Sequence, residues 1–221
     1  MALNLLMLGP PGAGKGTQAE RFAKQRGIPK ISTGDILREA VATRTEIGQR
    51  AKAVMDRGEL VGDEVMIGIV QERLERPDAM SGFVLDGFPR TVAQASALDA
   101  IMAERDPLIV VDIVVPEDEL VRRLGTRSIC RLCGTGASVG STVGAACAKC
   151  GGRLVQRTDD NQAVVLERLK VYHRQSEPLV EYYRVRPTFR SIDGAQPPDR
   201  VAADLAAAIA AASNGAAGVQ G

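Results

Sequence analysis

The sequence has no excess of either charge and no apolar run long enough to cross a membrane. Its 221 residues include 28 lysines and arginines and 27 aspartates and glutamates, a formal net charge of +1. A general basic field for nucleic acid is therefore absent, and any positive patch must be local. A membrane-spanning helix needs about 20 apolar residues, so we expect no membrane segment. The first apolar segment begins almost at once, so we also expect no signal peptide.

Histidine and cysteine are also scarce, with one histidine, His173, and four cysteines. The cysteines form two Cys-x-x-Cys pairs, Cys130 with Cys133 and Cys147 with Cys150, separated by thirteen residues. Thiolates at this spacing favour one tetrahedral structural zinc in a reducing compartment, with two disulfides or unligated thiols as alternatives. A catalytic zinc is not favoured, because four sulfurs leave no open coordination position and His173 lies in another segment.

The segment that holds the cysteines, residues 125–160, has no aromatic side chain and is rich in glycine, alanine and serine. Such a segment cannot build a hydrophobic core of its own and needs a metal or another cross-link to stay ordered. A zinc ribbon that binds nucleic acid is a rival interpretation, but the segment lacks aromatic side chains on which bases could stack.

Outside this segment, short apolar runs alternate with helical patterns. Because strands that alternate with helices form parallel sheets with right-handed crossovers, ligands are expected at the carboxyl ends of the strands. Asp63 is a candidate cap of the helix that follows it. The pattern predicts strands at 5–8, 28–32, 82–86, 108–115 and 189–193. It predicts one helix at 17–24 and another that begins within 32–35. Further helices are predicted at 47–55, 64–75, 91–102, 116–124, 163–183 (broken near Pro178) and 202–213.

The first strand leads into Gly9-Pro-Pro-Gly-Ala-Gly-Lys-Gly-Thr17. Its glycines let the backbone approach an anion, and the N–H groups of the turn and of the following helix can hold phosphate beside the charge of Lys15. The pattern is typical of a phosphate-binding loop, with an ordinary strand-to-helix turn as the alternative. Gly16 occupies the position where most such loops have a Ser or Thr, so we expect magnesium to rely more on phosphate oxygens and water.

A second motif, Asp86-Gly-Phe-Pro-Arg90, follows the third predicted strand. Asp86 would therefore lie beside the phosphate loop, where its carboxylate could hold magnesium-bound water; without the loop it would be an ordinary strand-end acid. Five arginines suit a reaction whose transition state spreads negative charge over several oxygens. They are Arg38, Arg90, Arg127, Arg157 and Arg168.

Four motifs together resemble the adenylate kinase family, in the version whose lid carries zinc: the phosphate loop, Ile31-Ser-Thr-Gly-Asp35, Leu85-Asp-Gly-Phe-Pro-Arg90 and Arg157-Thr-Asp-Asp160. The resemblance covers nearly the whole chain. It implies an α/β P-loop fold of three layers around a five-stranded parallel sheet. It divides the chain into a core (1–31, 62–125 and 161–221), a small helical AMP-binding domain (32–61) and a lid (126–160).

The resemblance also implies site residues. The catalytic group would be Lys15, Asp86, Arg90, Arg127, Arg157 and Arg168. ATP would contact Gly12, Ala13, Gly14, Lys15, Gly16, Thr17, Arg123, Arg127 and Gln196, with Arg123 stacked on the base and Gln196 acting through its backbone. AMP would contact Thr33, Arg38, Glu59, Leu60, Val61, Gly87, Phe88, Pro89, Arg90, Gln94, Arg157 and Arg168, with the amide of Gln94 paired to adenine. Asp159 and Asp160 would assist lid closure.

The implied activity is reversible, magnesium-dependent phosphoryl transfer from ATP to AMP, which gives two ADP and balances the adenine nucleotides. The implied protein is a cytoplasmic monomer with a structural zinc and no nucleic-acid or membrane partner. Another nucleoside monophosphate kinase, for UMP, CMP or GMP, is an alternative, although Thr33 and Gln94 favour AMP and the long lid disfavours the short-lid pyrimidine enzymes. A non-enzymatic zinc-bearing nucleotide or nucleic-acid binder would leave Lys15 and the five arginines without a role.

The lid departs from the family pattern at two positions. Ser128 occupies the position of a usual second arginine, and an aromatic residue usually found near Ala137 is absent. Both departures concern the stability of the lid and its contact with the ATP base.

Overall fold

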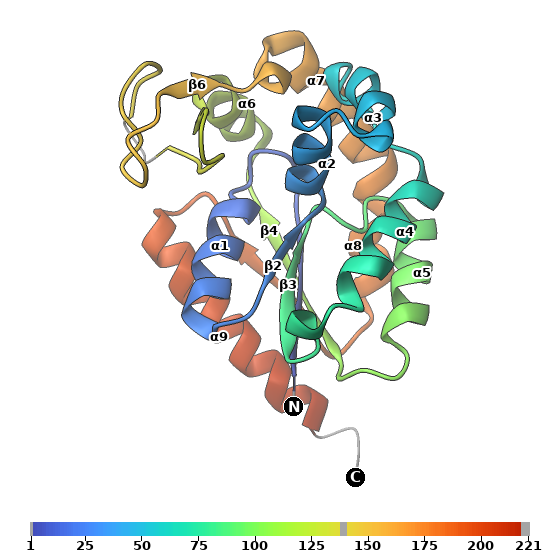
Figure 1. Ribbon diagram of the computed structural model, residues 1–221. Coiled ribbons are helices and arrows are strands. Elements are labelled where there is room, and N and C mark those ends of the chain that lie inside the picture. The colour runs from blue at the N-terminus through green and yellow to red at the C-terminus, as the bar shows by residue number, and fades with distance from the viewer. Residues whose placement is uncertain (1, 138–140, 218–221) are drawn as a thin grey trace.

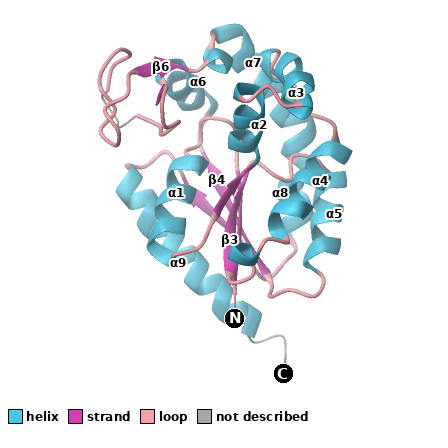
Figure 2. Ribbon diagram, in the orientation of Figure 1, coloured by secondary structure: helices cyan, strands magenta, loops and turns pink. Residues whose placement is uncertain are grey.

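Five parallel strands form the central sheet of the computed structural model, which describes residues 2–137 and 141–217 (Figures 1 and 2). Their spatial order is β2-β3-β1-β4-β7. The predicted parallel sheet is confirmed, although the second strand is shorter than expected. The bounds are β1 (Leu3–Leu8), β2 (Lys30–Ser32), β3 (Gly82–Asp86), β4 (Leu108–Val114) and β7 (Phe189–Asp193).

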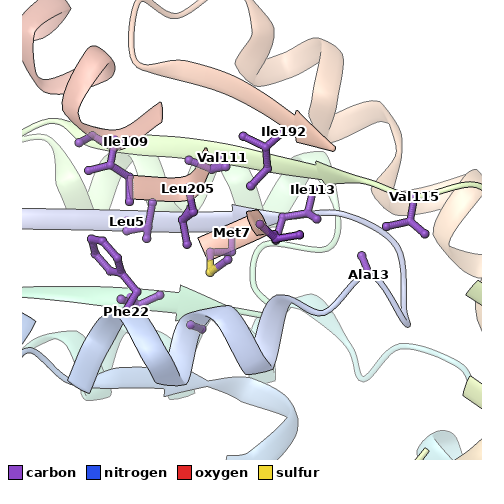
Figure 3. Close-up of a cluster of buried hydrophobic side chains, with 14 of the residues drawn as sticks. Leu5, Met7, Ala13, Phe22, Ile109, Val111, Ile113, Val115, Ile192 and Leu205 are labelled. Carbon is purple, nitrogen blue, oxygen red and sulfur yellow. The ribbon is translucent and has the colours of Figure 1, made fainter. Parts of the chain in front are cut away.

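Alternation along the strands gives the sheet two apolar faces. On β1, Leu5 and Met7 join one buried cluster, whereas Leu6 and Leu8 join the other, as expected for side chains that alternate across a strand. Figure 3 shows the first cluster, in which Phe22 packs over β1. Because both faces are covered, the three inner strands β3, β1 and β4 are mostly apolar, as in other buried parallel sheets, whereas the edge strands β2 and β7 include charged residues.

Helices complete the outer two layers. One buried cluster takes side chains from α1 (Lys15–Arg26) and α9 (Pro198–Ala217), and the other takes them from α4 (Asp63–Leu74), α5 (Val92–Met102) and α8 (Pro178–Arg184). Figure 1 shows these two groups on opposite sides of the sheet. The other helices are α2 (Thr33–Ala42), α3 (Glu46–Asp56), α6 (Glu117–Thr126) and α7 (Gln162–Val171). Among the described residues, none of the helices has the length and apolar character to span a membrane.

Two helical expectations need correction. The N-cap of α4 is Gly62, and Asp63 is the first helical residue, so Asp63 does not cap α4. Its carboxylate instead accepts hydrogen bonds from α5 and from the loop before it. The predicted helix 163–183 is interrupted earlier than expected, by a π-helical segment at Tyr172–Ser176. Pro178 then begins α8 at the first turn, where its missing N–H leaves no helical hydrogen bond unmade.

The cysteine-bearing segment folds as a separate small unit with an antiparallel pair, β5 (Ser128–Cys130) and β6 (Leu154–Gln156). These strands were not predicted. Its buried hydrophobic cluster consists of Cys130, Cys147 and Leu154, with two alanines packed against it. The unit is therefore as poor in apolar core as its composition indicates, although residues 138–140 lie outside the described part of the chain.

Candidate active site and lid metal centre

The glycine-rich loop joins β1 to α1, and its backbone requires glycine at both ends. Gly9 and Gly14 have φ of +132° and +94°, a region that L side chains rarely adopt. At Gly9, a Cβ would also lie 2.6 Å from the carbonyl oxygen of Ile113 on β4. Gly14 is the N-cap of α1 and has no side chain, so the N–H groups of the first helical turn are left for an anion.

Lys15 is the first residue of α1, so the helix starts two residues before its predicted start at Thr17. The Nζ atom donates hydrogen bonds to the carbonyl oxygens of Gly9 at 2.6 Å and Pro10 at 2.9 Å. Burial lowers the pKa of Lys15 to about 8, although Asp86 favours the charged form. Three arginines lower this pKa further: Arg90, Arg168 and Arg127. The ammonium group thus lies in a positive environment that an anion would relieve.

Asp86 ends β3 directly opposite Met7 of β1, at the carboxyl edge where the phosphate loop begins. A Cβ at position 16 would lie 3.3 Å from Oδ2 of Asp86. Glycine at position 16 therefore leaves room between the start of α1 and this carboxylate. Carboxylate oxygens and water are the ligands that Mg²⁺ prefers, so Asp86 fits the predicted contact with a magnesium-bound water.

Asp112 is a second acid at this edge, and sequence reasoning missed it. It lies on β4 opposite Leu8 and is 5 % exposed, and its Oδ1 has no hydrogen-bond partner among the described residues. Burial raises the pKa of Asp112, and Lys15 acts against that shift. Asp112 also lines a cavity of about 690 Å³ together with Pro10, Tyr172 and Glu177. The available signal was its position as the one acid inside the β-branched run 108–115.

Three of the predicted arginines meet two aspartates at the base of the lid. Arg127 makes two hydrogen bonds to Asp160, at 2.7 and 2.6 Å, and Arg157 makes two to Asp159, at 2.9 and 2.7 Å. Arg168 reaches both acids, at 3.0 and 3.2 Å. The structure therefore brings together side chains from three separate segments of the chain.

The opposite charges in this network favour each other's ionised forms. Burial alone would raise the pKa of Asp159, but Arg157 and Arg168 lower it to about 2. Burial lowers the pKa of Arg168 to about 10, against the effect of Asp159. Since guanidinium groups form two-point contacts with phosphate as readily as with carboxylate, these acids occupy positions that phosphate oxygens could take.

Thr33 and Arg90 meet at Gly87, in the loop after β3. The Thr33 hydroxyl donates to the Gly87 carbonyl oxygen at 2.7 Å, and Nε of Arg90 donates to the same oxygen at 2.8 Å. Burial lowers the pKa of Arg90, and Asp86 opposes that shift. Phe88 is 1 % exposed and joins Pro89 through a cis peptide bond. The motif 86–90 thus connects the sheet edge to α2.

The other predicted AMP contacts flank this loop. Arg38 on α2 pairs with Asp35, and burial lowers its pKa, with Arg157 adding to the shift. Glu59 faces Arg57 in an exposed ion pair of 2.7 Å. Leu60 is partly buried, and Val61 packs against the buried cluster on the α4–α5 side. Within this set, Val61 thus contacts the buried core, and Arg38 is close enough to Arg157 for the two charges to interact.

Gln94, the predicted reader of the base, is 1 % exposed. Its Oε1 accepts a hydrogen bond from the backbone N–H of Arg90 at 2.7 Å, and its Nε2 donates to Oδ1 of Asp63 at 2.7 Å. Asp63 is not among the site residues that the motifs predict. No local signal reveals this role, because the contact joins α4 to α5 across 31 positions.

Two predicted ATP contacts lie apart from the arginine network. Nε of Arg123 donates to Glu119 on the same helix at 2.7 Å. Gln196 follows β7, and its amide donates to Asp204 at 2.9 Å and to the carbonyl oxygen of Asp193 at 3.3 Å. Arg123 is about a quarter exposed, so its guanidinium is open to a ligand on one side.

The four lid cysteines converge, with their Sγ atoms within 4.8 Å of one another. Cys130 and Cys150 are 3.4 Å apart, and Cys133 and Cys147 are 3.8 Å apart. A tetrahedral zinc with Zn–S bonds of about 2.3 Å places its sulfurs about 3.8 Å apart. The backbone N–H groups of Leu132, Cys133 and Lys149 donate to these sulfurs, which stabilises thiolates. The four residues therefore fit a zinc ion.

A glycine-rich loop at the carboxyl edge of a parallel sheet, with several cationic side chains around it, suits phosphoryl transfer better than other chemistry. Phosphoryl transfer needs positioning and neutralisation of charge and little covalent help from the protein. The fold and this arrangement of cations define a phosphotransferase of the P-loop class.

Comparison with known sequences identifies the family. The sequence model described as "Adenylate kinase" matches residues 7–188. A protein from Archaeoglobus fulgidus named "Adenylate kinase" is 54% identical over 200 residues, which cover 87% of this chain and 91% of the relative. Proteins with the same name from Geobacter sp. and Magnetococcus marinus are 49% and 46% identical over 214 and 212 residues, and each is covered in full. The chain belongs to the adenylate kinase family, as its motifs predict.

Proposed function

We propose that this protein catalyses the reversible transfer of a phosphoryl group from ATP to AMP, which gives two molecules of ADP. The observation that carries the proposal is the environment of Lys15, whose pKa is lowered by burial and whose charged neighbours include Asp86, Arg90, Arg127 and Arg168. An anion with several charges would satisfy these cations. A transferring phosphoryl group between two nucleotides is such an anion.

On the ATP side, the phosphate loop and the start of α1 bind phosphate oxygens through backbone N–H groups, and Lys15 adds a charge that moves with its flexible side chain. Arg127, Arg157 and Arg168 exchange their aspartate partners for phosphate when the lid closes. Arg123 contacts the ATP base, and the backbone of Gln196 meets its edge. Closure excludes water, which strengthens each electrostatic contact and prevents loss of the phosphoryl group to hydrolysis.

On the AMP side, Arg38 and Arg90 bind the phosphate of the acceptor. Thr33, the segment 59–61 and the loop 87–89 enclose the base, and Gln94 reads its edge. These contacts hold the attacking oxygen of AMP in line with the transferred group, so proximity supplies a large share of the rate.

Magnesium would arrive with ATP and supply charge neutralisation between its phosphates. Asp86 is the side chain on this chain that would hold a magnesium-bound water, beside the space that Gly16 leaves open. We also propose that the four cysteines hold a structural zinc, which orders the lid and takes no part in the chemistry.

The domain organisation belongs to the same proposal. The core comprises 1–31, 62–125 and 161–221, the AMP-binding domain comprises 32–61, and the lid comprises 126–160. The ion pair of Arg127 with Asp160 joins the two ends of the proposed lid, and the pair of Arg157 with Asp159 lies beside it at the C-terminal end, which supports a hinge there. A monomer in a reducing cytoplasm, without nucleic-acid or membrane partners, is the expected setting.

The test is a coupled assay that offers AMP, UMP, CMP and GMP separately with ATP and magnesium. The proposal expects AMP to be by far the best acceptor. A preference for another monophosphate would assign the protein to that kinase class, and binding of ATP without transfer to any acceptor would favour a nucleotide-binding protein without enzymatic activity.

A further inference from the structure

The side-chain amide of Gln94 is held at one end by a hydrogen-bond donor and at the other end by an acceptor. The backbone N–H of Arg90 can only donate, and it lies 2.7 Å from Oε1. The carboxylate of Asp63 accepts, and its Oδ1 lies 2.7 Å from Nε2. These two partners fix which end of the amide is oxygen and which is nitrogen, because rotation by 180° would oppose two acceptors at Asp63 and two donors at Arg90.

Asp63 is itself fixed. Its second oxygen, Oδ2, accepts a hydrogen bond from the hydroxyl of Thr91 at 3.0 Å, so both carboxylate oxygens are used. The same hydroxyl caps α5 by accepting from the backbone N–H of Gln94 at 3.2 Å. Asp63 also begins α4, where the partial positive charge of the helix N-terminus favours a carboxylate. The carboxylate is therefore held in place from two sides, on α4 and on α5.

The orientation of this amide decides which purine it can pair with. Adenine presents an acceptor at N1 next to a donor on its 6-amino group, whereas a 6-oxopurine such as hypoxanthine presents a donor at N1 next to an acceptor at O6. An amide donates from nitrogen and accepts at oxygen, so one orientation matches adenine and the reversed orientation matches the 6-oxopurine. Each atom of the Gln94 amide keeps one hydrogen-bonding position beyond those used by Arg90 and Asp63.

We propose that Asp63 is a positioning residue for base selection, which holds the amide of Gln94 in the orientation that accepts adenine and rejects 6-oxopurines. This inference rests on the proposed function, in which Gln94 reads the acceptor base. Asp63 does not touch the nucleotide and acts through Gln94. A rejected base would leave buried polar groups unpaired, which is the strongest basis for selection between similar substrates.

The burial of Gln94 makes the mechanism effective. At 1 % exposure, the amide reaches a base only when the segments around it separate. Its orientation is set by protein contacts that exist in the absence of nucleotide, so the base meets an amide that is already aligned. Such preorganisation reduces the cost of ordering the site when the substrate binds.

The test compares AMP with inosine monophosphate as acceptors, since their bases differ only in this donor and acceptor pattern. In Asp63→Asn the new side chain can either donate or accept, so of the two groups that opposed rotation of the Gln94 amide only the backbone N–H of Arg90 remains. We expect the ratio of kcat/KM for AMP to that for inosine monophosphate to fall at least about tenfold, while the KM for ATP changes less than about twofold. If this variant does not fold, Asp63→Ser, which also removes the carboxylate that opposes rotation of Gln94, makes the same comparison.

Two further variants separate the possible causes. Asp99→Asn removes a carboxylate on the same helix as Gln94, where it pairs with Tyr182 and Arg186; it should lower stability and leave the selectivity ratio unchanged. Gln94→Leu should abolish selectivity. An unchanged ratio in Asp63→Asn beside a collapsed ratio in Gln94→Leu would refute the role of Asp63 and leave the base reader intact. An unchanged ratio in both would overturn the base site of the proposed function, and this inference with it.

Discussion

Arg127 and Asp160 join the two ends of the lid through two parallel hydrogen bonds, Nε to Oδ2 at 2.7 Å and Nη2 to Oδ1 at 2.6 Å, although 33 positions separate them. The side chain of Asp160 is fully buried, whereas that of Arg127 remains 28 % exposed. The arginine is therefore open to solvent on one side, whereas the aspartate is enclosed by protein. This asymmetry supports the proposal that Arg127 exchanges partners while Asp160 keeps its position.

Replacement of Asp160 should destabilise the protein. In Asp160→Asn, Arg127 and Arg168 lose the charge of a buried carboxylate, and we expect the free energy of unfolding to fall by about 2 kcal/mol, the scale of a hydrogen bond to a charged group. Urea denaturation measures the change. The matched control is Asp199→Asn, because Asp199 pairs with Arg21 but is 90 % exposed, and an exposed pair contributes less than about 1 kcal/mol. Equal effects in the two variants would contradict a special role for Asp160.

Removal of the loop ammonium should stop the chemistry. Lys15→Met keeps the length of the side chain and deletes the charge, so we expect kcat/KM to fall about a thousandfold or more, since a lost charge contact with the transition state in a dry site costs several kcal/mol. Lys24→Met on the exposed side of the same helix is the control. A folded Lys15→Met protein whose activity stays within tenfold of the parent would contradict the assignment of the phosphate loop.

The lowered pKa of Lys15, about 8, makes the free enzyme sensitive to alkaline pH. Only the protonated ammonium binds phosphate, so kcat/KM for ATP should decline above about pH 8. Bound phosphate raises the pKa again, so the corresponding decline in kcat should lie at higher pH. Parallel pH profiles of the two parameters test this. Coincident declines would mean that the ammonium does not contact ATP.

The lowered pKa of Lys15 also affects the free energy of unfolding. Alkaline pH, which should lower activity, should raise this contribution to stability. Between about pH 8 and the ordinary pKa of 10.5, the unfolded chain binds a proton at Lys15 that the folded chain releases, so this residue adds stability as pH rises. Lys15→Met removes that contribution. We therefore expect the unfolding free energy of the parent to rise relative to that of the variant between pH 7 and pH 10. Urea denaturation of both proteins without nucleotide measures this difference.

The features that could be predicted from the sequence are those whose cause is local. The run Leu5–Leu8 is apolar on both faces and is followed by glycines, so a buried strand and an anion-binding turn follow from neighbouring residues alone. The cysteine pairs behave similarly, since each Cys-x-x-Cys turn sets its own geometry. These patterns are confirmed as the central strand β1 and as the cluster of four sulfurs.

The features that could not be predicted depend on contacts between distant segments. Asp63 has the sequence position of a helix cap, but its carboxylate instead accepts hydrogen bonds from Gln94 on α5 and from Thr91, the N-cap of α5. Strands β5 and β6 have three residues each, and their pairing follows from the convergence of the cysteines rather than from strand propensity. Asp112 lies inside an apolar run, and only the packed sheet reveals that it is buried and that its Oδ1 has no hydrogen-bond partner in the part of the chain that the structure describes.

Removal of zinc should loosen the lid and leave the core intact. The buried cluster of the lid consists of two of its cysteines and Leu154, so metal binding would supply most of its folding free energy. In Cys130→Ser with Cys133→Ser, we expect loss of bound zinc, rapid protease cleavage within 126–160 and one cooperative unfolding transition for the core. Because Arg127 and Arg157 border the lid, kcat should fall and the KM for ATP should rise more than the KM for AMP. A double variant that loses zinc but keeps a protease-resistant lid and parental kinetics would refute the structural role. Loss of chemistry in an ordered lid would instead indicate a catalytic metal, which four thiolate ligands disfavour because they leave no open coordination position.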